Sequence, residues 1–195
     1  MYQSKFAEYF KGYQDKFFQA IWNLVAQNRV PKNSERLISA MLRYLGDCCS
    51  IPQYSEFLKQ NLSHIFTALI EPNISITEED FDEYMSEPHQ YIKNDLEESD
   101  TETRRRLCMK FVQQLSKKYP AEMQQLIGAQ AQRLMEMYNQ NREQNWALKA
   151  AMLNLLITAS VGSYTYNYGA TDLLITPEIL FSYLDQLVMP ELQIS

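Results

Sequence analysis

The residues with side chains suited to catalysis or metal binding are few and widely spaced in this sequence. Of the two histidines, His64 lies in an apolar stretch and His89 in an acidic one, and neither has a cysteine or serine partner at a readable spacing. The three cysteines, Cys48, Cys49 and Cys108, fit neither a disulfide framework nor a zinc motif, which suits a reducing compartment. Glycine-rich phosphate loops and paired-histidine metal motifs are absent. The sequence therefore predicts no enzyme, no cofactor and no metal.

The strongest chemical signal is an asymmetry of charge. Ten acidic residues and one lysine fall between Glu78 and Asp100, so this window carries a charge of −9 in a chain of 195 residues whose net charge is −6. The rest of the chain is therefore slightly basic, and the acidity belongs to one segment. Basic pairs such as Lys117-Lys118 are too short for a nucleic-acid face. We therefore expect no nucleic-acid partner.

Three consecutive arginines follow the acidic window, at Arg104, Arg105 and Arg106. Guanidinium groups bind carboxylates through paired hydrogen bonds, so these residues could contact acidic patches on a protein partner. They could equally pair with acidic residues of the same chain, Asp100 among them. The acidic window itself could act as a hinge, bind a basic partner or be a solvated excursion. Residue type and spacing leave these alternatives open.

Apolar residues recur every three or four positions over most of the chain, which predicts amphipathic helices. Only 5 glycines occur, too few for an all-β fold, and no apolar run approaches the ~18 residues of a membrane span. Asn33 is a candidate cap for the second helix, Pro72 is expected to end the third, and the sequence from Ser99 to Glu102 is typical of a capping box. The seven predicted helices cover about residues 6–25, 37–46, 57–70, 104–119, 120–138, 146–157 and 177–188, with a shorter helical piece near 81–85 that starts at Thr77 to Asp80.

Consecutive helices joined by short connections are typical of an α-solenoid. Paired in order, the first six form three antiparallel hairpins of roughly HEAT-repeat length, and the acidic segment 72–99 is an insertion in the second pair. The sequences IFTALIEPNI and LDQLVMPELQ have a similar pattern, because each is an apolar run followed by a proline. The seventh helix has no partner, which makes about three and a half pairs and predicts that residues 1–195 are one array from a longer protein. Residues 161–175 are predicted to be an aromatic loop, whose Tyr164, Tyr166 and Tyr168 either form a contact patch or pack over the adjacent repeat.

A more specific signal lies in the sequence YIKNDLEESDTETRRRLCMKFVQQL, from Tyr91 to Leu115. This run resembles the CAS-type exportins, the importin-α re-exporters of the importin-β superfamily. Further similar stretches lie in the same order: Arg36 to Leu58 and the proline-closed IFTALIEPNI before it, and Asn145 to Ser160 and LDQLVMPELQ after it. The resemblance covers nearly the whole chain and is strongest from Ile70 to Leu115.

The resemblance implies a fold and a function. It implies a superhelix of HEAT repeats that wraps importin-α and Ran-GTP together, shuttles between nucleus and cytoplasm, and meets nucleoporins through the full receptor. The acidic segment is implied to be the hinge between closed and open forms, and its candidate residues are Glu78, Glu79, Asp80, Phe81, Asp82, Glu83, Tyr91, Asp95 and Glu97. Arg104, Arg105 and Arg106 are the candidate partner contacts. The alternative function is a HEAT-repeat scaffold or regulatory subunit without Ran dependence.

Overall fold

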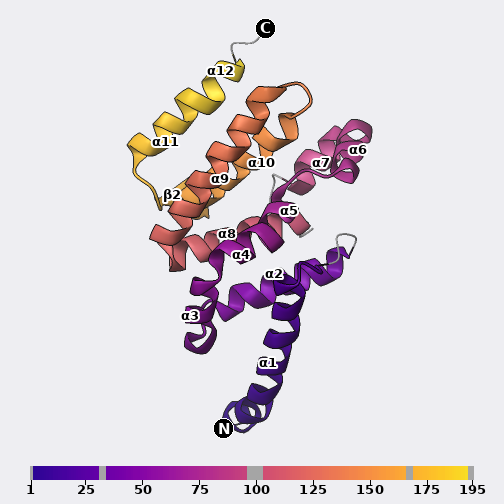
Figure 1. The fold of residues 1–195 in the computed structure, drawn as a ribbon, viewed down its shortest axis with the longest axis vertical. Coiled ribbons are helices and arrows are strands. Elements are labelled where there is room, and N and C mark those ends of the chain that lie inside the picture. Colours follow the sequence, from indigo (N-terminus) through magenta and orange to yellow (C-terminus); the bar gives the residue numbers. More distant parts are fainter. Residues whose placement is uncertain (1, 31–33, 96–102, 166–168, 193–195) are drawn as a thin grey trace. The chain divides into compact units, whose positions relative to one another are not determined.

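The computed structural model describes residues 2–30, 34–95, 103–165 and 169–192, and this part of the chain is mostly helical (Figure 1). The chain divides into two compact units, Met1–Phe111 and Val112–Ser195, with the boundary inside one helix. The elements of the first unit are α1 (Tyr2–Ala26), α2 (Glu35–Cys48), α3 (Pro52–Gln60), α4 (Leu62–Ile65), the π-helical turn η1 (Phe66–Ile70), α5 (Glu71–Ile74), α6 (Glu78–Ser86), α7 (Pro88–Asp95) and the first half of α8 (Arg104–Lys118).

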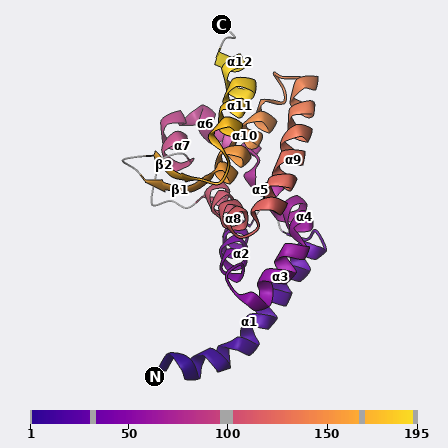
Figure 2. The ribbon, with the colours of Figure 1, turned by 90° about the vertical axis from the view of Figure 1, so that its left-hand side faces the viewer.

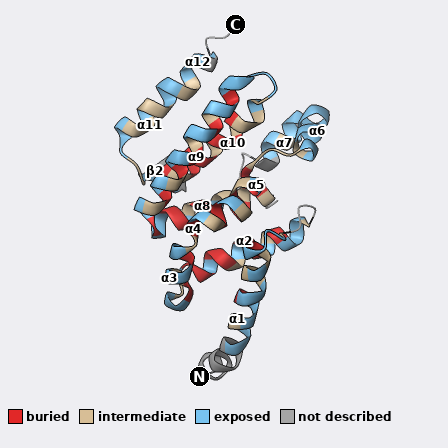
Figure 3. Ribbon diagram, viewed as in Figure 1, coloured by how far each residue is buried: buried red, intermediate tan, exposed pale blue. Residues whose placement is uncertain are grey.

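The core of the first unit is built by the apolar stripes of the three N-terminal helical runs (Figure 3). Phe18 of α1 stacks on Tyr54 of α3 with 4.4 Å between ring centroids, and Trp22 meets Phe57 edge-on at 4.8 Å. The buried face of α2 consists of Ile38, Met41, Leu42, Leu45 and Cys48. Helix α1 therefore packs on α3 and α4, the third helical run along the chain.

The third predicted helix continues past the proline that was expected to end it. Pro72 lies in α5, and the residues after it, Asn73 and Ile74, are buried. The turn before it is widened into η1, where the amide of Glu71 donates to the carbonyl of Phe66 five residues earlier. A proline ring collides with the carbonyl four residues before it in a regular α-helix, and a π turn changes that spacing. The prediction of a stop at Pro72 was therefore wrong.

The helices of the acidic segment and the one that follows it have defined starts. Thr77 and Asp80 form a capping box at the start of α6, where the sequence predicted a helix start, whereas α7 was not predicted. Helix α8 begins at Arg104, where the hydroxyl oxygen of Thr103 accepts a hydrogen bond from the amide of Arg106. The capping box predicted from Ser99 to Glu102 lies outside the described residues, as does Asn33. Ser34 is the residue before α2.

The second unit contains the end of α8, α9 (Pro120–Gln140), α10 (Trp146–Ser160), β1 (Val161–Thr165), β2 (Gly169–Leu173), α11 (Pro177–Tyr183), the π-helical turn η2 (Leu184–Val188) and α12 (Met189–Leu192). Figure 1 and Figure 2 show α9 beside α10, as expected for the fifth and sixth predicted helices. Pro190 repeats the pattern of the first unit, because η2 precedes it and the amide of Met189 donates to the carbonyl of Leu184.

The prediction of an irregular loop at 161–175 was wrong, because β1 and β2 pair there as an antiparallel hairpin. The sequence from Ser163 to Gly169 alternates small or polar residues with tyrosines, and an alternation of period two is typical of a strand. The side-chain amide of Gln113 in α8 fixes the start of β1 by donating to the carbonyl of Val161 at 2.7 Å. Tyr166 and Tyr168 lie outside the described residues.

The buried stripe of α2 can be tested with two leucines of the same helix. Leu45 is fully buried, whereas Leu37 is 38% exposed. We expect Leu45→Ala to lower the free energy of unfolding by about 2–5 kcal/mol, because it leaves a cavity in a close-packed core. Leu37→Ala makes the same change in helix propensity and should cost less than ~1 kcal/mol. Urea denaturation followed by circular dichroism measures both, and equal losses would contradict this assignment of the core.

Candidate functional site at the acidic insertion

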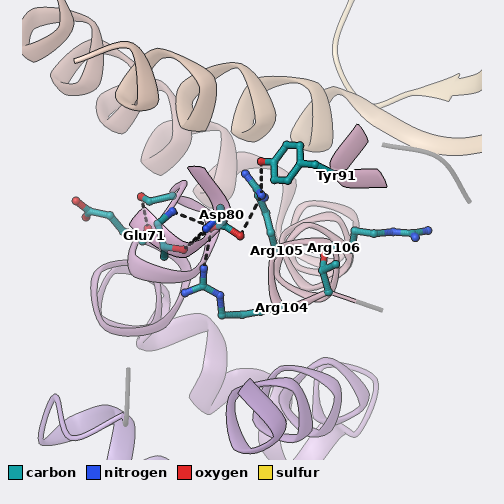
Figure 4. Close-up of polar contacts among 9 residues, drawn as sticks. Glu71, Asp80, Tyr91, Arg104, Arg105 and Arg106 are labelled. Atoms are coloured by element: carbon teal, nitrogen blue, oxygen red, sulfur yellow. Dashed lines mark hydrogen bonds and ion pairs between the residues drawn. The ribbon is translucent and has the colours of Figure 1, made fainter. Parts of the chain in front are cut away.

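Within the described residues, the carboxylate of Asp80 joins the acidic insertion to α8 (Figure 4). Its Oδ2 atom accepts hydrogen bonds of 2.7 Å from both the amide and the hydroxyl of Thr77, which completes the cap of α6. The same oxygen lies 3.4 Å from the guanidinium of Arg104, and Oδ1 lies 3.5 Å from that of Arg105. One side chain therefore both starts α6 and ties it to α8.

Arg105 makes a second contact with the insertion through Tyr91 of α7. Its guanidinium donates a 2.7 Å hydrogen bond to the phenol oxygen of Tyr91 and lies 5.5 Å from the centroid of that ring. The Tyr91 ring in turn meets Tyr84 of α6 edge-on at 5.6 Å. Only 3% of Arg105 is exposed, so its charge depends on Asp80 and Tyr91 for compensation. Arg105 is thus the residue that joins both helices of the insertion to α8.

The three candidate arginines do not share one environment. Arg104 and Arg105 point toward Asp80, whereas the side chain of Arg106 extends away from it (Figure 4). The intramolecular alternative drawn from the sequence thus describes Arg104 and Arg105, but their partner is Asp80, since Asp100 lies outside the described residues. Contact of the three arginines with a protein partner remains a prediction.

The described side chains of α6 and α7 are exposed or half-buried. No residue of α6 is buried, and every residue from Phe81 to Gln90 is exposed. Of the candidate hinge residues, Glu78, Glu79, Phe81, Asp82 and Glu83 are all exposed, Asp95 ends α7, and Glu97 lies outside the described residues. Of this set, the structure shows Asp80 and Tyr91 in contact with the candidate arginines. Such a segment is held mainly by polar contacts, and it can leave its site at a modest cost in free energy.

Comparison with known proteins places this geometry in a family. The model of the family described as Cse1 matches residues 1–195. The chain belongs to the Cse1 family. Exportin-2 of Dictyostelium discoideum is 29% identical over 164 residues, which cover 84% of this chain and 17% of that protein. The importin alpha re-exporter of Saccharomyces cerevisiae is 27% identical over 174 residues, 88% of this chain and 18% of that protein.

A solved structure described as the exportin Cse1 in its cargo-free, cytoplasmic state has the same fold. The TM-score is 0.83 at 26% identity, and the match covers 94% of this chain and 20% of that one. The predicted resemblance to CAS-type exportins and the HEAT-type helical solenoid are thereby confirmed. This Cse1-family chain spans about a fifth of the length of the relatives it matches.

The residues first considered for catalysis have structural environments in this Cse1-family chain. Nε2 of His64 lies 3.0 Å from the carbonyl oxygen of Val25, and the His64 ring contacts Trp22. Burial raises the pKa of the Cys108 thiol to about 12 and that of the Cys48 thiol to about 11, so both are protonated at neutral pH. In the described part of the chain, no three acidic, histidine or cysteine side chains are grouped to hold a metal ion, and every helix falls short of the length and apolarity needed to cross a bilayer.

The contact between Arg105 and Tyr91 generates a test of how the insertion is held. Tyr91→Phe removes the acceptor of the 2.7 Å hydrogen bond and leaves the cap of α6 intact. We expect the free energy of opening of α6 and α7 to fall by about 1–2 kcal/mol, because a buried guanidinium loses one of its hydrogen-bond acceptors. Amide hydrogen exchange of the full-length protein at residues 78–95 should accelerate by roughly 5- to 30-fold.

Tyr84→Phe is the matched control, because it removes a phenol hydroxyl from the same insertion without touching Arg105. Equal exchange in the two variants would show that the hydrogen bond to Arg105 does not hold the insertion.

Proposed function

We propose that this chain is a central segment of a nuclear export receptor that returns importin-α from the nucleus to the cytoplasm together with Ran-GTP. The observation that carries the proposal is the match along almost the whole chain to exportins, with a TM-score of 0.83 to a solved one. The name of the yeast relative, importin alpha re-exporter, supports importin-α as the cargo. The receptor would shuttle through nuclear pores by contact with nucleoporins.

The acidic insertion is the hinge in this proposal. Its support is the geometry of docking: Asp80 and Tyr91 contact Arg104 and Arg105, while the outer residues of α6 and α7 are exposed. A segment held by few contacts has docked and undocked states of similar free energy. Ran-GTP and importin-α then need only a modest difference in affinity between the two states to shift their populations. Binding of either one would favour binding of the other.

The arginines have a defined place in the proposed mechanism. An acidic patch on Ran or importin-α that approached α8 would compete with Asp80 for Arg104 and Arg105, and Arg106 is the third candidate contact on the same helix. Partner binding and release of the insertion are therefore coupled through the same guanidinium groups. The chain itself supplies no catalytic step in this proposal: hydrolysis of GTP occurs on Ran and releases both partners.

The proposed function predicts capture of importin-α that depends on the nucleotide of Ran. The full-length receptor containing this chain should retain importin-α when Ran is locked with GTP, and at least tenfold less when Ran carries GDP. The reason is that cargo and Ran-GTP favour the same receptor conformation. Pull-down with purified proteins and quantitative staining measures the difference. Equal capture in both nucleotide states, or none in either, would leave a HEAT-repeat scaffold without Ran dependence.

The hinge predicts a change in shape when its docking is weakened. Asp80→Asn removes the charge that pairs with Arg104 and Arg105, so the cargo-free receptor should populate more open forms and show a larger radius of gyration. Small-angle X-ray scattering of the full-length receptor measures this change. Asp82→Asn makes the same substitution at an exposed position two residues away and should leave the profile unchanged. A profile of Asp80→Asn identical to that control would contradict a hinge role for the insertion.

A further inference from the structure

A cleft of about 1090 Å³ lies within the first unit, beside the insertion. Its wall is formed by the segment that follows α1, the start of α2, the helical run through η1 and α5, the first part of α6, Tyr91 of α7 and the start of α8. Asp80 and its arginines form part of this wall. The cleft therefore combines residues from the solenoid helices with residues from the insertion, and its chemistry depends on both.

The charges that line the cleft are unequal. Among the described residues, the lining includes five carboxylates and two cationic groups, the guanidiniums of Arg104 and Arg105. Both guanidiniums already pair with Asp80. The carboxylates of Glu35, Glu78 and Glu79 are exposed, and within the described part of the chain none of them takes part in an ion pair. The open cleft consequently has an excess of negative charge that its own arginines do not neutralise.

The remaining lining is apolar and lies between these carboxylates. Val30, Ala68 and Pro72 contribute aliphatic surface to the wall. Lysine and arginine side chains have an aliphatic stem and a cationic end, and they lay the stem along apolar surface while the end reaches polar groups. A wall with aliphatic patches and three exposed carboxylates fits this type of side chain. A divalent cation does not fit it, because no group of described residues is arranged to hold a metal.

We propose that this cleft binds a lysine- or arginine-rich segment of a protein partner. Glu35 belongs to α2, whereas Glu78 and Glu79 belong to the first turn of α6. A cationic segment that contacts both sets bridges the solenoid and the insertion, so its binding stabilises the docked insertion. The effect of an acidic group would be the opposite: it would compete with Asp80 for the arginines and so favour release of the insertion. The role of this bridge in transport rests on the proposed function, but the binding itself does not.

The experiment uses an octalysine peptide as the probe and the full-length receptor as the target. A carbodiimide couples lysine amines to carboxylates in contact with them, and mass spectrometry of the digest identifies the coupled residues. We expect coupling at Glu35, Glu78 and Glu79, and at least fivefold less at Asp82 and Glu87, which are exposed on the same insertion outside the cleft. Coupling spread evenly over these five residues would overturn the proposal, because it would reflect general acidity.

A matched pair of variants supplies the second measurement. Glu78→Gln/Glu79→Gln removes two charges from the cleft, and Asp82→Asn/Glu87→Gln removes two charges from elsewhere on the insertion. Fluorescence anisotropy with labelled octalysine should show affinity at least fivefold weaker for the first variant and changed less than twofold for the second. Equal losses would overturn the proposal, as would an unchanged affinity in the first variant. Circular dichroism confirms that both variants remain folded.

The probe contains neither importin-α nor Ran, so the two proposals fail separately. Localised coupling together with nucleotide-independent capture would reject the export function and keep the cationic site. Ran-GTP-dependent capture without localised coupling would do the reverse.

Discussion

The docking of the described part of the insertion rests on the carboxylate of Asp80, which serves two purposes. Its Oδ2 atom accepts hydrogen bonds from the amide and hydroxyl of Thr77 at the start of α6, and its two oxygens lie beside the guanidinium groups of Arg104 and Arg105, whose charges they compensate. An arginine that is almost fully buried cannot remain there without an anionic or polar partner, because the loss of its hydration is not otherwise repaid. The docking of α6 on α8 and the burial of Arg105 therefore depend on each other. Neither holds without the other, and this dependence makes a largely exposed segment part of the folded unit.

Much of the helical fold could be predicted from the sequence, because the apolar stripes report directly which face of each helix is buried. The helix starts at Thr77 and Pro120 followed from a capping residue and from a proline at the first helical position. Two errors came from treating local signals as decisive. Pro72 predicts the end of the third helix, but buried side chains before and after it stabilise the continued helix. The tyrosine-rich stretch after Ser160 lacks a helical period, which predicts a loop. Its alternation has a period of two, which is typical of a strand, and β1 and β2 pair there.

The candidate site was harder to predict, because a count of charges does not show which acidic residue pairs with which arginine. Ten acidic residues precede the three arginines, and sequence proximity favoured Asp100 over Asp80, which lies twenty-four residues from Arg104. The capping box at Thr77 fixed where Asp80 would lie on α6, yet spacing alone could not bring α6 onto α8. The sequence marks Tyr91 as a candidate hinge residue but does not show that its hydroxyl accepts a hydrogen bond, since the donor lies fourteen positions away. Long-range pairing of this kind depends on tertiary structure, not on local pattern.

The widened turns before Pro72 and Pro190 also constrain how this sequence can change. Each contains one residue more than an α-turn, which rotates everything beyond it by about 100° around the helix axis. Past η1 that rotation places Asn73 and Ile74 on the buried side. Deleting one residue from this turn would rotate them toward solvent, while replacing one apolar residue by another of similar size would not. Apolar substitutions of similar size should therefore be tolerated at 66–70, whereas changes of length should be rare there.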